Sequence, residues 1–74
     1  MYTVSPVDHR FSIKRLRAAS GISQQQLADR LGLHKTTVSH WEHGIAMPSR
    51  ALLPRVAEIF GVTVDQLLRG AKAS

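Results

Sequence analysis

The sequence contains no cysteine and few acidic residues, and both shortages limit what the protein can be. Without cysteine it has no disulfides and no thiolate metal ligands, which fits a reducing cytoplasm. Five Asp and Glu stand against ten Lys and Arg, for a formal net charge of +5. This excess of positive charge favours a polyanionic partner, nucleic acid before an acidic membrane surface.

Long apolar runs are also missing. No stretch approaches the ~18 apolar residues typical of a membrane span, and the first residues, "MYTVSPVDHR", lack the pattern of a secretory signal. We therefore expect a cytoplasmic protein with no membrane partner. A chain of 74 residues has room for one small domain, residues 1–74, with its core at about residues 6–70 and a frayed tail at 71–74.

The apolar residues recur with the spacing of helices and not of strands. Gly and Pro divide the chain into five short segments, which predicts a compact all-α domain of five helices. The expected segments are Pro6–Ser20, Ser23–Gly32, Lys35–His43, a fourth that begins at Ser49 or nearer Leu53, and Thr63–Gly70. The fourth start is ambiguous because Pro54 lacks a backbone donor.

Polar pairs three residues apart predict where helices begin, because each pair can form a capping box. The pairs that fit are Ser23–Gln26, Thr63–Gln66 and Ser5–Asp8. Ser12 is an alternative cap for the first helix.

The segment "KTTVSHWEH", residues 35–43, carries many hydrogen-bonding side chains around one Val and the only Trp. At about 100° per residue, Val38 and Trp41 fall on one side of a helix and should anchor it in the core. The opposite side is a continuous polar arc made of Lys35, Thr36, Ser39, His40 and His43. The arc has no acidic side chain, whereas solvated helix faces usually mix both signs.

A short turn containing glycine, "GLH", joins this segment to the preceding helix, which is the layout of a helix-turn-helix. In that motif the second helix enters the major groove and presents its first residues to base edges. Lys, Thr and His all suit such contacts. The base-contacting candidates are Lys35, Thr36, Ser39 and His40. A merely solvated face is the alternative interpretation of the arc.

Phosphate contacts are expected beside the arc. Gln24 combines an amide with the backbone donors of a helix N-terminus. Thr37 lies at the border of the arc. Arg50, near the start of the fourth helix, either contacts a phosphate or is solvated.

No enzyme, cofactor or metal site is expected. Ser39 and His40 are adjacent and so diverge on a helix, and no acid is placed to orient the imidazole. His40 and His43 share one face, but without Cys or a carboxylate on the arc the metal-ligand set is incomplete.

The motifs "SQQQLA", "VSHWEHG" and "GVTVDQLL", in this order and spacing, resemble one known family. About residues 11–70 are similar to the Xre-type helix-turn-helix domain of phage Cro and lambdoid repressors. The resemblance implies a lambda-repressor-like five-helix domain that binds double-stranded DNA, usually as a homodimer on an inverted repeat.

The resemblance also implies roles for individual residues. It implies base contacts for Lys35, Thr36 and His40, and phosphate contacts for Gln24, His34 and His43. Arg17 and Glu42 match a pair that ties the first helix to the third. Phe60 to Leu68, in the last two helices, match the usual dimer contact. Because Lys35 and His40 are unusual at their positions, the operator sequence does not carry over.

These features predict a sequence-specific transcription regulator, a repressor or controller protein. The alternative is an antitoxin, a protein-binding module that neutralises a toxin and also binds its own promoter. If His34, His40 and His43 lie at the DNA, its affinity should rise as the pH falls through about 6.5, where imidazole ordinarily gains a proton.

Overall fold

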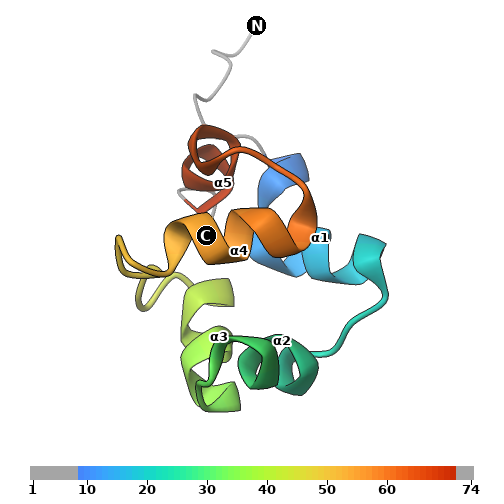
Figure 1. The fold of residues 1–74 in the computed structure, drawn as a ribbon, viewed down its shortest axis with the longest axis vertical. Helices are drawn as coiled ribbons and strands as arrows, with labels where there is room; N and C mark the ends of the chain where they lie inside the picture. The colour runs from blue at the N-terminus through green and yellow to red at the C-terminus, as the bar shows by residue number, and fades with distance from the viewer. Residues whose placement is uncertain (1–8, 72–74) are drawn as a thin grey trace, which may run out of the picture.

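The computed structural model describes residues 9–71, which form five α-helices preceded by one 3-10 turn (Figure 1). The elements are η1 (His9–Phe11), α1 (Ile13–Ser20), α2 (Gln24–Leu31), α3 (Lys35–Glu42), α4 (Leu53–Phe60) and α5 (Val64–Ala71). No strand occurs within this range, and the predicted all-α fold is confirmed. None of the helices in residues 9–71 is long and apolar enough to cross a membrane.

Polar caps set the starts of two helices as predicted. The Ser23 hydroxyl accepts from the Gln26 backbone N–H at 3.0 Å, and the Gln26 side chain accepts from the Ser23 N–H at 2.8 Å. Thr63 and Gln66 exchange the same two bonds, both at 3.0 Å. Each box satisfies backbone donors that the first turn of a helix leaves unpaired.

The prediction that the first helix begins at Pro6 is wrong. Ser12 has an extended backbone, with φ −64° and ψ 147°, and its hydroxyl accepts from the Arg15 N–H. An extended residue interrupts a helix, so α1 begins at Ile13, after the alternative cap. The Ser5–Asp8 pair lies outside the described residues.

α4 begins later, and α5 ends later, than the longest predicted fourth segment and the predicted fifth segment do. α4 begins at Leu53, the later of its two predicted starts, and Pro54 lies in its first turn. The N–H groups of the first turn have no partner within the helix, so the missing N–H of Pro54 costs no helical hydrogen bond. α5 does not stop at Gly70 but continues to Ala71. A Cβ at Gly70 would collide with the backbone of Phe11 and Ser12. This glycine therefore allows α5 to approach the start of α1 closely.

The core lies between all five helices. Val38 and Trp41 are 0% and 5% exposed, which confirms that one side of α3 faces inward. The other buried apolar residues are Ile13, Leu27, Ala28, Leu31, Leu53, Val56, Ala57 and Leu67. In Figure 1, α2 and α3 lie together at one end, α4 crosses the middle and α5 lies at the other end. The core thus supports α3 from behind and leaves its outer side free.

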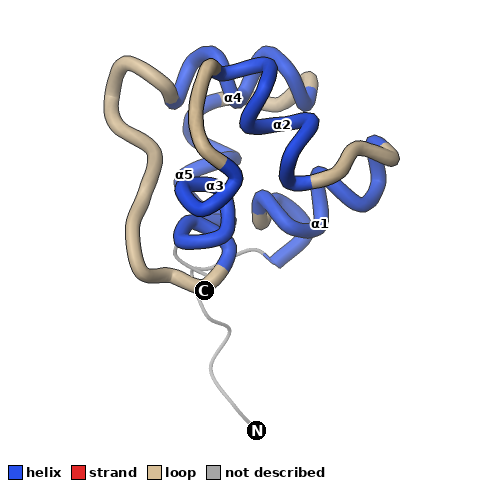
Figure 2. The backbone as a smooth tube through the Cα atoms, turned by 90° about the horizontal axis from the view of Figure 1, so that it is seen from below, coloured by secondary structure: helices blue, strands red, loops and turns tan. Residues whose placement is uncertain are grey.

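The connection between α3 and α4 is much longer than the other three between α-helices. It runs from residue 43 to residue 52, whereas each of the others has three residues. Figures 1 and 2 both show it bowing away from the helices.

Candidate nucleic-acid interface

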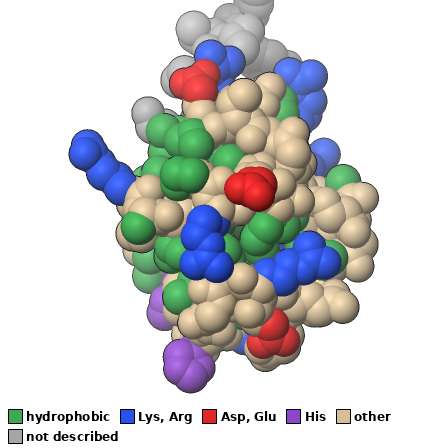
Figure 3. All heavy atoms as spheres, viewed as in Figure 1, with side chains coloured by type: hydrophobic (Ala, Val, Ile, Leu, Met, Phe, Trp, Pro, Cys, Tyr) green, Lys and Arg blue, Asp and Glu red, His purple; other side chains and the backbone are tan. Residues whose placement is uncertain are grey.

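The outer side of α3 carries the predicted base-contacting residues. Lys35, Thr36 and His40 are exposed, whereas Ser39 is half-buried. His34 and His43, at the two ends of the helix, are exposed as well, and Thr37 is half-buried. We call the set of His34, Lys35, Thr36, Ser39, His40 and His43 the α3 face. Figure 3 shows the His side chains gathered over this end of the molecule, while the acidic side chains in that view lie over other helices.

The turn between α2 and α3 sets the angle at which α3 is presented. Gly32 adopts a left-handed conformation with φ 70°, and the Leu33 N–H returns to the Ala28 carbonyl at 2.9 Å. This geometry ends α2 and reverses the chain within three residues. His34 caps α3 by position only, because its side chain makes no capping hydrogen bond. The His34 imidazole therefore makes no hydrogen bond to the backbone N–H groups at the start of α3.

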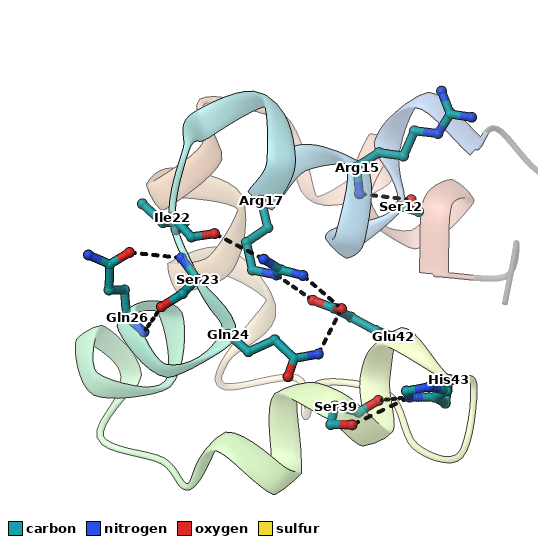
Figure 4. Close-up of polar contacts among 10 residues, drawn as sticks. All are labelled: Ser12, Arg15, Arg17, Ile22, Ser23, Gln24, Gln26, Ser39, Glu42 and His43. Atoms are coloured by element: carbon teal, nitrogen blue, oxygen red, sulfur yellow. Dashed lines mark hydrogen bonds and ion pairs between the residues drawn. The ribbon is translucent and has the colours of Figure 1, made fainter.

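A buried polar network fixes α3 against the rest of the domain (Figure 4). The Glu42 side chain is only 3% exposed, and its carboxylate accepts from Arg17 Nε at 2.7 Å and from Arg17 Nη2 at 3.1 Å. Arg17 Nη1 also donates to the Ile22 carbonyl at 3.0 Å. Gln24 Nε2 donates to Glu42 Oε1 at 3.0 Å. The network therefore joins α1, α2 and α3 at a single carboxylate.

The ionisation of Glu42 follows from these contacts. Burial raises the pKa of its carboxyl, but the hydrogen bonds from Arg17 and Gln24 and the nearby positive charges outweigh burial and hold the pKa below its ordinary value. The hydrogen bond to Glu42 raises the pKa of Arg17. Both partners are thus charged at neutral pH, as a bidentate pair requires.

Gln24 contacts Glu42 and also lies at the N-terminus of α2, where a phosphate contact is predicted. One of its amide N–H groups donates to the Glu42 carboxylate, a contact that the sequence does not predict. The second amide N–H and the backbone N–H at the first residue of α2 stay available as donors. No spacing rule in the sequence links Gln24 to Glu42, because the two residues are 18 positions apart.

The exposed His43 has a defined tautomer. Its Nδ1 lies 2.8 Å from the Ser39 carbonyl oxygen, which can only accept, so Nδ1 carries a proton. In the neutral ring Nε2 is then an acceptor and cannot donate to a phosphate. Protonation adds a donor at Nε2 together with a positive charge.

Two other sets of predicted residues belong to other segments than α3. Arg50 is exposed in the connection before α4. Phe60, Val62, Val64 and Leu68, from the predicted dimer contact, are half-buried against the core, and Leu67 is fully buried. Much of that apolar surface therefore already packs inside one copy. Within residues 9–71, no three His, Cys, Asp or Glu side chains form a metal-ligand group.

The amino-acid sequence of this chain is similar to those of known helix-turn-helix proteins. Residues 13–67 match the family described as Helix-turn-helix. The chain is 36% identical over 58 residues to the HTH-type transcriptional activator BcrR of Enterococcus faecalis, covering 78% of this chain and 28% of that protein. It is 38% identical over 61 residues to a prophage-derived uncharacterized HTH-type transcriptional regulator, YonR, of Bacillus subtilis, covering 82% and 56%.

A third relative matches a similar share of this chain. The HTH-type transcriptional regulator AnsR of Bacillus subtilis is 38% identical over 56 residues, covering 76% of this chain and 48% of that protein. The chain thus spans between 28% and 56% of the length of these three relatives. No solved structure matches it significantly.

Proposed function

Because this chain belongs to the helix-turn-helix family, we propose that it is a sequence-specific DNA-binding transcription regulator that reads base edges with α3. The observation that supports this most directly is the α3 face. Its residues are exposed except for the half-buried Ser39, none of them is acidic, and a buried carboxylate network joins its helix to α1 and α2. Rigid elements position base-reading side chains better than loops do.

In this proposal the residues divide into two groups. Lys35, Thr36, Ser39 and His40 face the bases, where Lys35 donates to guanine and Thr36 makes polar or methyl contacts. Around them, the phosphate contacts come from Gln24, His34, Thr37, His43 and Arg50. Phosphate contacts set the register of the helix on the duplex but carry no sequence information.

The regulator acts as a homodimer on an inverted repeat, with its two α3 helices in successive turns of the major groove. Occupying such a site within a promoter excludes polymerase, so repression is the simplest mechanism.

Selection of binding sites from random DNA at about 150 mM salt tests the function, because non-specific binding is weak at that salt. An enriched inverted repeat with half-sites one helical turn apart is the expected result. Failure to enrich any sequence would refute the proposal and favour a protein-binding module, which pull-downs would then test.

Single substitutions test the assignment of α3. Lys35→Ala and His40→Ala should each cost about 1–3 kcal/mol of binding free energy and relax the preference at one position of the site. Arg15→Ala is the matched control for Lys35→Ala, since it also removes one exposed positive charge. Figure 4 shows the Arg15 side chain pointing away from α3. An unchanged sequence preference in both α3 variants would show that α3 is not the recognition helix.

A further inference from the structure

A pocket opens on the surface between α2 and α4. Its volume is about 260 Å³, and it is lined by Arg30, Arg55, Glu58 and Ile59. The three charged residues are exposed and Ile59 is half-buried. Figure 3 shows Lys and Arg side chains on this side of the molecule, between α4 and the end that α2 and α3 form. None of the four lining residues belongs to the α3 face or to the proposed phosphate contacts.

A hydrogen bond between the two helices orients one wall of the pocket. Arg55 Nη2 donates to the backbone carbonyl of Arg30 at 3.2 Å, so the Arg55 side chain reaches from α4 to the last turn of α2. This bond uses only one of the several N–H donors of a guanidinium. The remaining donors keep the planar arrangement that matches the two oxygens of a carboxylate.

The charged groups of the pocket do not neutralise one another directly. Among residues 9–71, Glu58 forms no ion pair with Arg30 or Arg55. The pocket therefore presents two positive charges, one negative charge and the aliphatic surface of Ile59 to a ligand. Glu58 repels a simple anion, and the two guanidinium groups repel a simple cation. A small molecule that carries both charges is complementary to all of these groups.

We propose that this pocket binds a free α-amino acid with an aliphatic side chain. Its α-carboxylate accepts hydrogen bonds from Arg30 and Arg55, and its α-ammonium group faces the Glu58 carboxylate. The aliphatic side chain packs on Ile59. The volume suits such a ligand, because it lies below the ~300–1,000 Å³ typical of sites for drug-sized molecules. The inference goes beyond the proposed function and does not depend on it.

Titration of the isotope-labelled chain with L-leucine, followed by its amide NMR signals at constant ionic strength, tests the site. At about pH 6.5 the α-amino group of the ligand is protonated. We expect saturable shifts of the signals of the four lining residues, with half-saturation at about 1–10 mM. This is the weak affinity of a small ligand held by exposed charges.

Two relatives of leucine test whether both charges are recognised. N-acetyl-L-leucine lacks the ammonium group, and L-leucinamide lacks the carboxylate. Each should bind at least about fivefold more weakly than leucine, because it loses one favourable charge contact and is repelled by the group of like charge.

Substitutions in the pocket separate recognition of charge from a merely structural effect. In Glu58→Gln no acidic group repels N-acetyl-L-leucine, so this variant should bind it about as tightly as it binds leucine. Arg55→Gln should weaken leucine binding about fivefold or more. The matched control is Arg15→Gln, which removes an exposed positive charge that does not line the pocket. It should leave the affinity for leucine within about twofold of the parent.

The inference is overturned if the lining residues show no saturable shift up to about 50 mM leucine, well above the expected range. Equal affinity of the parent for leucine, N-acetyl-L-leucine and L-leucinamide would overturn it too, because the charges would then not be recognised. Inorganic phosphate that binds as tightly as leucine would make the pocket a simple anion site. None of these results bears on the proposed function, which selection of DNA sites tests through other residues.

Discussion

Replacing Arg17 with methionine should destabilise the domain, because the buried Glu42 carboxylate loses its ion-pair partner. Methionine keeps much of the length of the side chain but removes both bonds to Glu42 and the bond to the Ile22 carbonyl. Glu42, with its side chain 3% exposed, then keeps only the bond from Gln24. A buried charge without its ion-pair partner is far more costly than the loss of an exposed pair.

The magnitude follows from the burial of the two partners. Breaking a buried pair by removing one partner costs about 3–5 kcal/mol. The Arg17 side chain is 18% exposed, so water can partly replace it, and we expect about 3 kcal/mol at neutral pH. In Arg17→Met/Glu42→Met no buried charge is left. The double variant should therefore be less destabilised than the sum of the single variants by about 2 kcal/mol, well above the ~0.5 kcal/mol scatter of additive sites.

The effect should also depend on pH. In the parent, the pKa of Glu42 is lowered, so its contribution to stability is present above its ordinary pKa and is lost as the pH falls through the lower folded value. Without Arg17, burial, the largest influence, dominates and raises the pKa of Glu42 in the folded state. The carboxyl then destabilises the variant as the pH rises. The destabilisation caused by Arg17→Met should therefore grow between about pH 4 and pH 7.

Urea unfolding followed by Trp fluorescence measures both quantities. Trp41 is the only tryptophan, is 5% exposed and precedes Glu42 in α3, so its emission reports on this region. A domain of this size has about 5 kcal/mol of stability, which leaves the single variant a measurable folded baseline. Additive effects in the double variant, or a destabilisation that does not change with pH, would refute the view that Glu42 is a buried charge held by Arg17.

Two further predictions concern the ends of the domain and the α3 face. Gly70→Ala should destabilise the fold by about 2–4 kcal/mol in urea unfolding, because its Cβ collides with the Phe11 backbone. Gly61→Ala should cost only about 1 kcal/mol, since φ is 67° but no atom lies within 4 Å of the new Cβ; equal losses would argue against the close approach of α5. His43→Ala should weaken DNA binding by about the same factor for every DNA sequence, because a phosphate contact carries no sequence information. Affinities of this variant measured on several DNA sequences test this prediction, and an unchanged affinity would exclude His43 from the phosphate contacts.

The local features of the domain could be predicted from the sequence, because they depend on residues a few positions apart. The capping boxes at Ser23 and Thr63 each join residues three positions apart. The division of α3 into a buried side, Val38 and Trp41, and an exposed polar side follows from helical periodicity alone. The family was also recognisable, because its motifs are runs of adjacent residues. The candidate base-contacting residues were found in this way.

Features that depend on segments far apart in the chain were decided by the tertiary structure. Ser5 and Ser12 were both plausible caps by sequence, whereas in the fold Ser12 lies against Gly70 and α1 begins directly after it. Gln24 reaches Glu42 only because α2 and α3 cross. The exposure of Ile45 and Met47 could not be predicted, because hydrophobicity does not say whether the folded chain provides a partner for an apolar side chain. In the first two cases a contact between distant segments made the choice, and in the third the lack of such a contact did; periodicity encodes neither.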